Sequence, residues 1–245
     1  MLGINFQASV PKSLSEQEAN EDAVSFDIDR GIFAISDGAS ESFDSKMWAR
    51  LLVTRFVQQP AVNPEWVSAI RQSYEADWDF DAMTWSQQAA FDRGSFATLL
   101  GVEWREHTHE LEVIAIGDSL AVHLDAAGSC TSHPYRQAEQ FNERPRLLST
   151  NAEANAFVSS STFYSESCAV WHLKEHSRVL LMTDALGQWL LTDPDSFHAR
   201  VELLLSANNE SAFNQFVLEQ RRLGAMRLDD TTFMSLSISK GVPSP

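Results

Sequence analysis

The feature that most constrains the fold is the order in which apolar segments with strand-like and helix-like spacing follow one another. Segments typical of strands come first, at 4–10, 23–29 and 31–36, and Asp29-Arg30-Gly31 between the last two suits a hairpin turn. Helix-like periodicity follows, then strands, helices and one last strand. Because hairpins outnumber strand–helix–strand units, this order predicts an α+β protein with mostly antiparallel sheets and segregated helices.

The same two periodicities predict the remaining elements. Helices are expected from Asp44 to the residue before Pro60, from Asn63 to Tyr74, and at 84–92. Further strands are expected at 95–104, 110–116, 119–124, 169–173, 178–183 and 231–239, and further helices at 186–191, 194–206 and 210–223. The stretch 125–167 is polar and mixed, and no element is assigned to it.

Length and charge bound the organisation and the partners. The 245 residues show no composition break, linker or repeat, which favours a single domain spanning 1–245. The formal net charge of -16 argues against nucleic acid and anionic membranes as partners, because both are bound through clustered Lys and Arg. An acidic chain also suits a site built from carboxylates, and such a site needs only a handful of the 34 Asp and Glu.

Cysteine usage and the N-terminus indicate a compartment. Cys130 and Cys168 are the only two cysteines, and no CxxC pair is present, so a reducing environment is expected. Residues 1–17 lack the basic start and apolar run of a signal peptide, and no apolar stretch approaches the ~20 residues that span a bilayer. A cytoplasmic protein is therefore expected.

Acidic residues recur where an apolar strand begins or ends. They are Glu21 and Asp22 before 23–29, Asp37 after 31–36, Asp118 after 110–116, Asp184 after 178–183, and Asp229 and Asp230 before 231–239. Strand ends can converge on one rim of a sheet, whereas strand interiors carry the core. Taken singly, each of these residues is more often a turn former or a helix N-cap than a ligand.

A set of converging carboxylates predicts a metal site. Carboxylates brought together repel one another and lose hydration, and a divalent cation removes both penalties. Mg²⁺ and Mn²⁺ prefer such oxygen ligands. Two of these ions about 4 Å apart can activate a bridging water and stabilise phosphoryl oxygens during in-line attack. This chemistry needs no serine or cysteine nucleophile.

Six segments resemble the metal-dependent serine/threonine phosphatases of the PPM family, the type 2C protein phosphatases. They are NEDA (20–23), FAISDGAS (33–40), GSFATLLGV (94–102), IAIGDSLAVHL (114–124), RVLLMTDALGQWL (178–190) and DDTTFMSLSI (229–238). No single segment is specific, but all six occur in the family's order and run nearly from end to end of the chain. The resemblance is to bacterial-type members.

The resemblance implies a four-layer α/β/β/α sandwich. Two antiparallel sheets would pack face to face with helices outside, and a cleft at one end would hold two Mn²⁺ or Mg²⁺ ions. By the same resemblance, Asp37 bridges the two ions and Gly38 offers its backbone carbonyl. Asp184 and Asp229 would bind one ion, and Glu21 would hold the other largely through water.

Further residues complete the implied site. Asp22 would orient metal-bound water from behind the ligands, so Asp37 and Asp22 are the predicted catalytic residues. Asp118 matches an acidic residue that helps hold a third, weaker metal in bacterial members. The family's phosphate-binding Arg corresponds to Gln17 here, and Lys12 from a different loop is the candidate to bind the substrate phosphate instead.

The chain also departs from the family at three more places. The family's Asp-Gly at the second metal strand is Asp184-Ala185, and an alanine there would cost about 1 kcal/mol if the turn needed a positive φ. The family's second acid four residues later is Gln188, a poorer ligand for a third metal. Ala39-Ser40 replaces the family's glycine pair after Asp37-Gly38.

Three readings follow from these features. The first is a phosphatase of bacterial-style signalling that hydrolyses phosphoserine and phosphothreonine monoesters on phosphoproteins, paired with a serine/threonine kinase. The second is a catalytically weak regulator that keeps the fold to bind a phosphoprotein or a kinase. The third is an unrelated acidic sandwich whose aspartates only cap turns.

Overall fold

The computed structural model describes residues 1–13, 15, 17–40 and 42–238, and most of its strands form two five-stranded sheets. The first sheet has the order β1 (Leu2–Val10), β12 (Thr231–Ile238), β11 (Arg178–Met182), β7 (Leu120–Leu124), β8 (Cys130–His133). The second has the order β10 (Cys168–His172), β6 (Glu110–Ile116), β5 (Leu99–Arg105), β3 (Ile32–Ser36), β2 (Ala23–Asp27). Neighbouring strands in both sheets run antiparallel, as the hairpin-rich order predicted.

Helices occupy the segments between the strands. The α-helices are α1 (Ser45–Gln58), α2 (Pro64–Ala76), α3 (Trp85–Arg93), α4 (Phe163–Ser167), α5 (Asp184–Leu191), α6 (Phe197–Ser206) and α7 (Glu210–Arg222). Short 3-10 turns lie at Gln17–Ala19, Phe80–Ala82, Ala138–Asn142, Glu153–Ser159 and Pro194–Ser196. The predicted N-cap of α2 is present, since Asn63 Oδ1 accepts a hydrogen bond from the Trp66 N–H at 2.8 Å.

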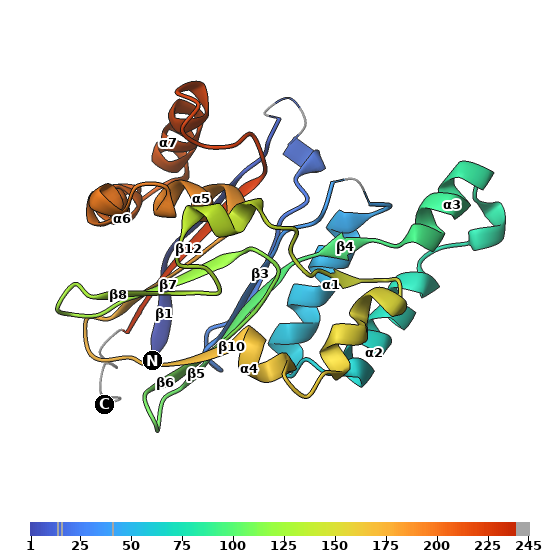
Figure 1. Cartoon of the computed structure of the whole chain (residues 1–245), viewed down its shortest axis with the longest axis horizontal. Helices are drawn as coiled ribbons and strands as arrows, with labels where there is room; N and C mark the ends of the chain where they lie inside the picture. Colours follow the sequence, from blue (N-terminus) through green and yellow to red (C-terminus); the bar gives the residue numbers. More distant parts are fainter. Residues whose placement is uncertain (14, 16, 41, 239–245) are drawn as a thin grey trace.

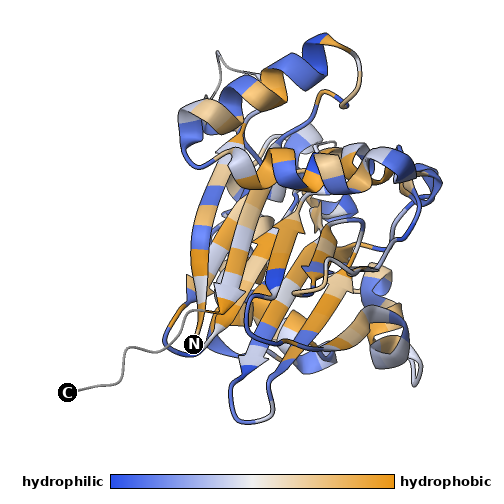
Figure 2. Cartoon of the chain, turned by 90° about the vertical axis from the view of Figure 1, so that its left-hand side faces the viewer, coloured by the Kyte–Doolittle hydropathy of each residue, from blue (hydrophilic) through white to orange (hydrophobic). Residues whose placement is uncertain are grey.

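Three apolar layers hold these elements together. The middle layer fills the space between the sheets, and each outer layer packs helices onto the far face of one sheet. Strand β3 shows why: its odd and even side chains point to opposite faces, so Phe33 and Ile35 enter the middle layer while Ile32 and Ala34 contact the layer under α1 and α2. Helices α5, α6 and α7 cover the other sheet (Figure 1). The four-layer α/β/β/α sandwich is thus confirmed, and its strands are the most apolar part of the chain (Figure 2).

Several element boundaries differ from those predicted. The expected strand 95–104 is interrupted at Thr98, which separates β4 (Phe96–Ala97) from β5. Strand β4 lies outside both five-stranded sheets and pairs with β9 (Leu148–Ser149), inside the stretch 125–167 that received no assignment. The expected helix 186–191 begins earlier, at Asp184, and the strand predicted at 231–239 ends at Ile238, the last residue described there.

None of the helices in the described part of the chain has the length and apolar character needed to cross a membrane.

Candidate metal centre

The predicted carboxylates lie at one rim of the sandwich because the strands are antiparallel. Ala23 pairs with Ser36, so Asp22 and Asp37 lie side by side just beyond the ends of β2 and β3. Met182 pairs with Phe233, which brings the segment before β12 beside the end of β11. The connection between β6 and β7 reaches the same rim, since Leu120 pairs with Met182.

A cavity of about 160 Å³ opens at this rim. Its lining contains four of the predicted carboxylates and the predicted backbone ligand, together with small neighbours: Asp37, Gly38, Ala39, Ser40, Thr98, Asp118, Pro145, Leu147, Asp184 and Asp229. Residues that are almost 200 positions apart in the chain therefore face one small volume. The structure thus brings Asp37, Gly38, Asp118, Asp184 and Asp229 together.

Thr98 holds the backbone of Asp37 in place. The Thr98 N–H donates to the Asp37 carbonyl, and the Asp37 N–H donates to Thr98 Oγ1, both at 2.8 Å. Thr98 Oγ1 also lies 2.9 Å from the hydroxyl of Ser119, next to Asp118. Thr98, at the interruption between β4 and β5, therefore fixes the backbone that carries the Asp37 carboxylate.

Gly38 is required here for space. A Cβ on Gly38 would lie 2.9 Å from Ser45 Cβ, closer than real side chains tolerate, and 3.0 Å from the Glu21 carbonyl oxygen, a contact tighter than most. Gly38 also forms an isolated antiparallel bridge with Ala97. Its backbone is thus wedged between the start of α1 and β4, where its carbonyl follows Asp37 directly.

Asp184 is the first residue of α5, with Thr183 as the N-cap. Burial raises the pKa of Asp184 to about 6, and the nearby charge of Asp118 adds to the rise, while Arg227 opposes it. Arg227 Nη2 lies 3.0 Å from Asp184 Oδ2, and Asp184 Oδ1 is buried with no hydrogen-bond partner in the described residues.

The strain considered for Ala185 is absent. Ala185 is buried in the first turn of α5, and the non-glycine residues with a positive φ in the described chain are His109 and His176. The alanine that follows the ligand candidate is therefore compatible with a regular helix start.

Asp22 lies behind the cavity, outside its lining. Its Oδ2 accepts hydrogen bonds from the hydroxyls of Thr232 at 2.6 Å and Thr183 at 3.3 Å. Its Oδ1 is closed off from solvent and has no partner in the described residues. Burial raises the pKa of Asp22 well above its ordinary value, although the Thr232 hydroxyl opposes the rise. This carboxylate links the two sheets at the rim.

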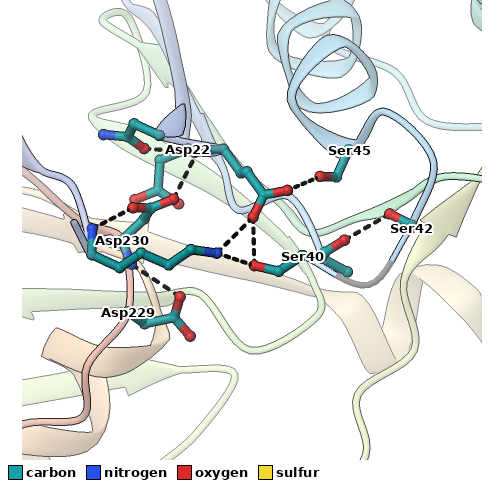
Figure 3. A network of polar contacts seen from close by, with 10 residues as sticks. Asp22, Ser40, Ser42, Ser45, Asp229 and Asp230 are labelled. Carbon is teal, nitrogen blue, oxygen red and sulfur yellow. Dashed lines mark hydrogen bonds and ion pairs between the residues drawn. The ribbon is translucent and has the colours of Figure 1, made fainter. Parts of the chain in front are cut away.

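Glu21 and Lys12 also lie outside the cavity lining, and both contact Ser40. Ser40 itself lines the cavity and is labelled in Figure 3. Glu21 Oε2 accepts from Lys12 Nζ at 3.1 Å and from the Ser40 hydroxyl, and Glu21 Oε1 accepts from the Ser45 hydroxyl at 2.5 Å. Lys12 Nζ donates to Ser40 Oγ at 2.6 Å. Burial alone would lower the pKa of Lys12, but the hydrogen bond and charge of Glu21 raise it.

Asp230 anchors this network to the last strand. Its Oδ1 accepts from the Lys12 N–H at 2.6 Å and its Oδ2 from the Glu21 N–H at 2.8 Å, so both backbone segments are tied to the start of β12 (Figure 3). Asp230 is only 2% exposed. Of the neighbouring pair, Asp229 therefore faces the cavity while Asp230 is structural.

The residue positions around Asp118 differ from those of a complete third-metal site. Asp118 lines the cavity, and burial raises its pKa while Arg227 opposes the rise. Gln188 is not part of the lining, and its Nε2 lies 3.5 Å from Asn142 Oδ1. In this part of the cavity, the guanidinium of Arg227 lies near the carboxylates. The side chain of Gln17 lies outside those described.

Arg221, near the end of α7, is a positioning residue that sequence patterns gave no reason to select. Its guanidinium donates to the carbonyls of Pro11 at 2.8 Å, Val10 at 3.3 Å and Asp229. It also donates to the Thr231 hydroxyl at 2.9 Å. A helix-terminal arginine is usually explained by the helix dipole alone, so only the tertiary contact shows that Arg221 joins the end of β1 to the segment carrying Asp229.

The electrostatics of the rim fit divalent cations. Burial raises the pKa of Asp37 well above its ordinary value, and the charges of Asp22, Asp184, Asp229 and Asp118 raise it further. Asp22 Oδ1 and Asp184 Oδ1 are buried oxygens without a protein partner, as expected of atoms that await a ligand. Within the described residues, no three Asp, Glu, His or Cys side chains already enclose a single metal position. The donor set therefore suits Mg²⁺ or Mn²⁺, although the side chains do not yet surround one point.

Comparisons with known proteins agree with this architecture. The serine/threonine phosphatase PstP/Ppp of Mycobacterium tuberculosis is 15% identical, with a TM-score of 0.64 over 98% of this chain and 99% of that one. The PstP catalytic domain in complex with two manganese ions is 14% identical, with a TM-score of 0.60 over the same shares. PppA, a key regulatory component of T6SS in Pseudomonas aeruginosa, is 18% identical, with a TM-score of 0.51 over 96% of this chain and 98% of that one.

At such identities the structural matches establish the fold alone. No curated protein sequence matches the chain significantly. A family model for protein phosphatase 2C, however, matches residues 11–220, which span most of the chain and include Glu21, Asp22, Asp37, Asp118 and Asp184 of the rim. By this match the chain belongs to the protein phosphatase 2C family.

Proposed function

We propose that the protein is a metal-dependent phosphatase that hydrolyses phosphoserine and phosphothreonine monoesters on proteins. The observation that carries the proposal is the set of carboxylates at the rim. They are partly or fully buried, they raise one another's pKa, and two of their oxygens have no protein partner. Such an arrangement is costly for a protein that binds no cation, and family membership supplies the chemistry that would use it.

Each rim residue has a role in this proposal. The carboxylates of Asp37, Asp184 and Asp229 and the carbonyl of Gly38 would hold two Mn²⁺ or Mg²⁺ ions, with Glu21 acting largely through water. Bound divalent cations lower the pKa of coordinated water and stabilise negative charge on phosphoryl oxygens.

Asp22, behind the cavity, would accept a proton or hydrogen bond from the attacking water through its unpartnered Oδ1. Thr98 would keep the Asp37 carboxylate in position through the two backbone hydrogen bonds.

Lys12 is proposed to bind the substrate phosphate in place of the family's arginine. Its ammonium reaches the cavity wall at Ser40, and the flanking carboxylate of Glu21 keeps it charged. Lys12→Met is expected to raise KM for p-nitrophenyl phosphate and the inhibition constant of inorganic phosphate roughly tenfold, because a charged hydrogen bond contributes about 1.5–3 kcal/mol. Lys174→Met, at an exposed lysine far along the chain, is the control. Equal KM values for Lys12→Met and the wild type would refute the assignment.

The decisive experiment compares p-nitrophenyl phosphate hydrolysis with Mn²⁺, with EDTA, and in Asp184→Asn. Turnover is expected to require metal. The mutant is expected to lose more than the roughly 10- to 100-fold that removal of an outer-sphere partner costs. Asp195→Asn changes an exposed aspartate and should behave as the wild type. Calorimetry with Mn²⁺ alone gives a second readout, because Asp184→Asn should weaken metal binding whether or not the protein turns over. If Asp184→Asn kept both its activity and its affinity for Mn²⁺, the site assignment would be refuted.

A second candidate is a catalytically weak member that binds a phosphoprotein or a kinase. It is favoured by the ion pairs that Arg227 makes with Asp184 and Lys12 with Glu21, since both place a protein cation on an expected metal ligand. Metal binding without turnover of any phosphopeptide would support it. EDTA-sensitive turnover would exclude it.

Signalling partners complete the proposal. The structural neighbour PppA is described as a key regulatory component of T6SS, and a phosphoprotein substrate with its cognate serine/threonine kinase fits such a regulatory setting. The proposed location is the cytoplasm. The reading of an unrelated acidic sandwich is wrong, because the family match covers residues 11–220.

A further inference from the structure

A groove of about 560 Å³ adjoins the candidate metal centre. The two share four lining residues, Ala39, Ser40, Pro145 and Leu147, so a chain leaving the metal cavity at this side enters the groove. Its walls come from the end of α3, from β4, from the segment that leads into β9, and from the 3-10 turn Glu153–Ser159. The groove is thus placed to contact the part of a substrate next to its phosphorylated residue.

Three arginines line the groove: Arg93, Arg144 and Arg146. The whole chain is acidic, with 18 Lys and Arg against 34 Asp and Glu. A groove lined by three arginines therefore has the opposite charge to the rest of the protein. No acidic side chain lines the groove among the described residues, and Glu41 lies outside them. Arginine forms two parallel hydrogen bonds with a carboxylate, so the groove has the chemistry to bind acidic side chains.

Two of the arginines are available for a ligand. Arg146 Nη1 lies 3.1 Å from Glu166 Oε2, and both side chains are largely exposed, so this pair is weak. Arg93 and Arg144 are exposed and make no ion pair or side-chain hydrogen bond within the described chain. An incoming carboxylate would therefore displace water from these two groups and not a protein partner.

The floor of the groove is apolar and is held in place by regular structure. Phe96, Phe157 and Ala90 contribute apolar surface, and Phe96 belongs to β4, which is hydrogen-bonded to β9. Arg93 is the last residue of α3, whose first turn carries a capping box at Thr84 and whose end is closed by Gly94 at φ +93°. Helix α3 lies at the edge of the molecule, away from the bulk of the sandwich (Figure 1). An extended peptide could therefore pass between α3 and the 144–147 segment.

We propose that this arginine groove selects phosphoprotein substrates that carry Asp or Glu beside the phosphorylated serine or threonine. The inference rests on the proposed function, since it concerns the substrate of that site. Arg93 and Arg144 are specificity residues in it: they bind the flanking segment and take no part in the hydrolysis. Specificity then arises from charge complementarity, which works against basic sequences as well as for acidic ones.

The test compares three phosphothreonine peptides of equal length, flanked on both sides by Glu, by Gln or by Lys. With Mn²⁺ and the full chain, kcat/KM is expected to be at least about tenfold higher for the Glu than for the Gln peptide, mostly through KM, and lowest for the Lys peptide. In Arg93→Gln/Arg144→Gln the three values should converge while p-nitrophenyl phosphate hydrolysis stays unchanged. The control Arg50→Gln/Arg105→Gln removes the same charge from exposed residues outside the groove and should keep the preference.

A binding experiment separates this proposal from the proposed function. Fluorescence anisotropy with the same peptides in EDTA needs no turnover, and the Glu peptide should bind more tightly than the Gln peptide to the wild type but not to Arg93→Gln/Arg144→Gln. High salt should abolish the preference of the wild type for the Glu peptide. Equal binding of the Glu and Gln peptides by the wild type, or a preference that survives in the double variant, would overturn the proposal even if the protein is an active phosphatase.

Discussion

Asp22 illustrates how a single buried carboxylate at the rim can lower the stability of the fold. Its carboxylate is surrounded by Asp230, Asp184 and Asp229, whose charges add to the effect of burial on its pKa. Two threonine hydroxyls satisfy one oxygen and leave the other free. Such a group destabilises the metal-free fold when it is ionised, because each unit by which its pKa is raised corresponds to about 1.4 kcal/mol.

Asp22→Asn is therefore expected to make the metal-free protein more stable. The amide oxygen can still accept from Thr232, while the buried charge is removed, so the free energy of unfolding in EDTA should rise by about 1 kcal/mol or more at neutral pH. Urea unfolding measures the change. Asp125→Asn is the control of opposite sign, since backbone N–H groups of Ser129 and Ala127 lower the pKa of Asp125 and favour its ionised form. A less stable Asp22→Asn protein would contradict the explanation.

Sequence reasoning selected the carboxylates that lie at the rim more easily than it found the contacts that support them. Asp37, Asp184 and Asp229 could be selected because each follows or precedes an apolar strand. Arg221 and Arg227 could not, because nothing in the local pattern says that a cation near the end of α7 folds back onto a strand or a carboxylate. The choice between Asp229 and Asp230 likewise depends on which way a side chain points at a strand start.

At the scale of elements, α1 and the second sheet meet through a close contact that fixes their spacing. A Cβ on Gly101 of β5 would lie 2.4 Å from the Phe56 ring of α1. The ring lies directly over the glycine, so the helix approaches the sheet as closely as the backbone allows. This spacing matters for the site because α1 also carries Ser45, which contacts Glu21 and packs against Gly38.

Gly101→Ala is expected to destabilise the protein by about 1–3 kcal/mol, the usual cost of forcing an extra carbon into a packed core. It should also weaken Mn²⁺ binding, because displacement of α1 moves Ser45. Urea unfolding and calorimetry measure the two effects. Gly3→Ala is the matched control, since nothing lies within 4 Å of its Cβ position. Unchanged stability in Gly101→Ala would show that α1 can shift without cost.

Element types were mostly predictable from periodicity, whereas element ends and small pairings were not. The strand at 95–104 shows the limit: its apolar pattern continues across Thr98, but hydrogen bonds between Thr98 and Asp37 interrupt it. Strands β8 and β9 lie in a polar stretch and are short, so tertiary pairing and not local pattern defines them.

For the whole molecule, the carboxylates make stability depend on pH and, under the proposed function, on metal as well. Because the folded-state pKa of Asp184 is about 6 and the ordinary value is 3.8, the folded protein binds more protons than the unfolded chain between these values. Stability contributed by this group therefore falls as pH rises from about 4 to about 6 in the absence of metal. The proposed metal binding would require the ionised carboxylates and would offset the loss.

The expected result is a stabilisation by Mn²⁺ that grows with pH. The urea midpoint with Mn²⁺ minus the midpoint with EDTA should increase from about pH 5 to about pH 7 and level off above it. Asp184→Asn should reduce this pH dependence. A difference that is constant over this range would indicate that the metal does not compete with protons at the rim.

The position of β12 has a consequence for how the protein is made. This strand is the last one in the described part of the chain, yet it lies between β1 and β11, and it follows directly on Asp229 and Asp230. During translation, at about 5–20 residues per second, β1 is made early but cannot pair with its neighbour in the first sheet until β12 has been made. A ribosome that stops before Asp229 therefore releases a polypeptide without one of its predicted metal ligands and without the strand that joins β1 to β11. Such a product would lack part of its first sheet and, under the proposed function, could not hydrolyse a phosphate ester.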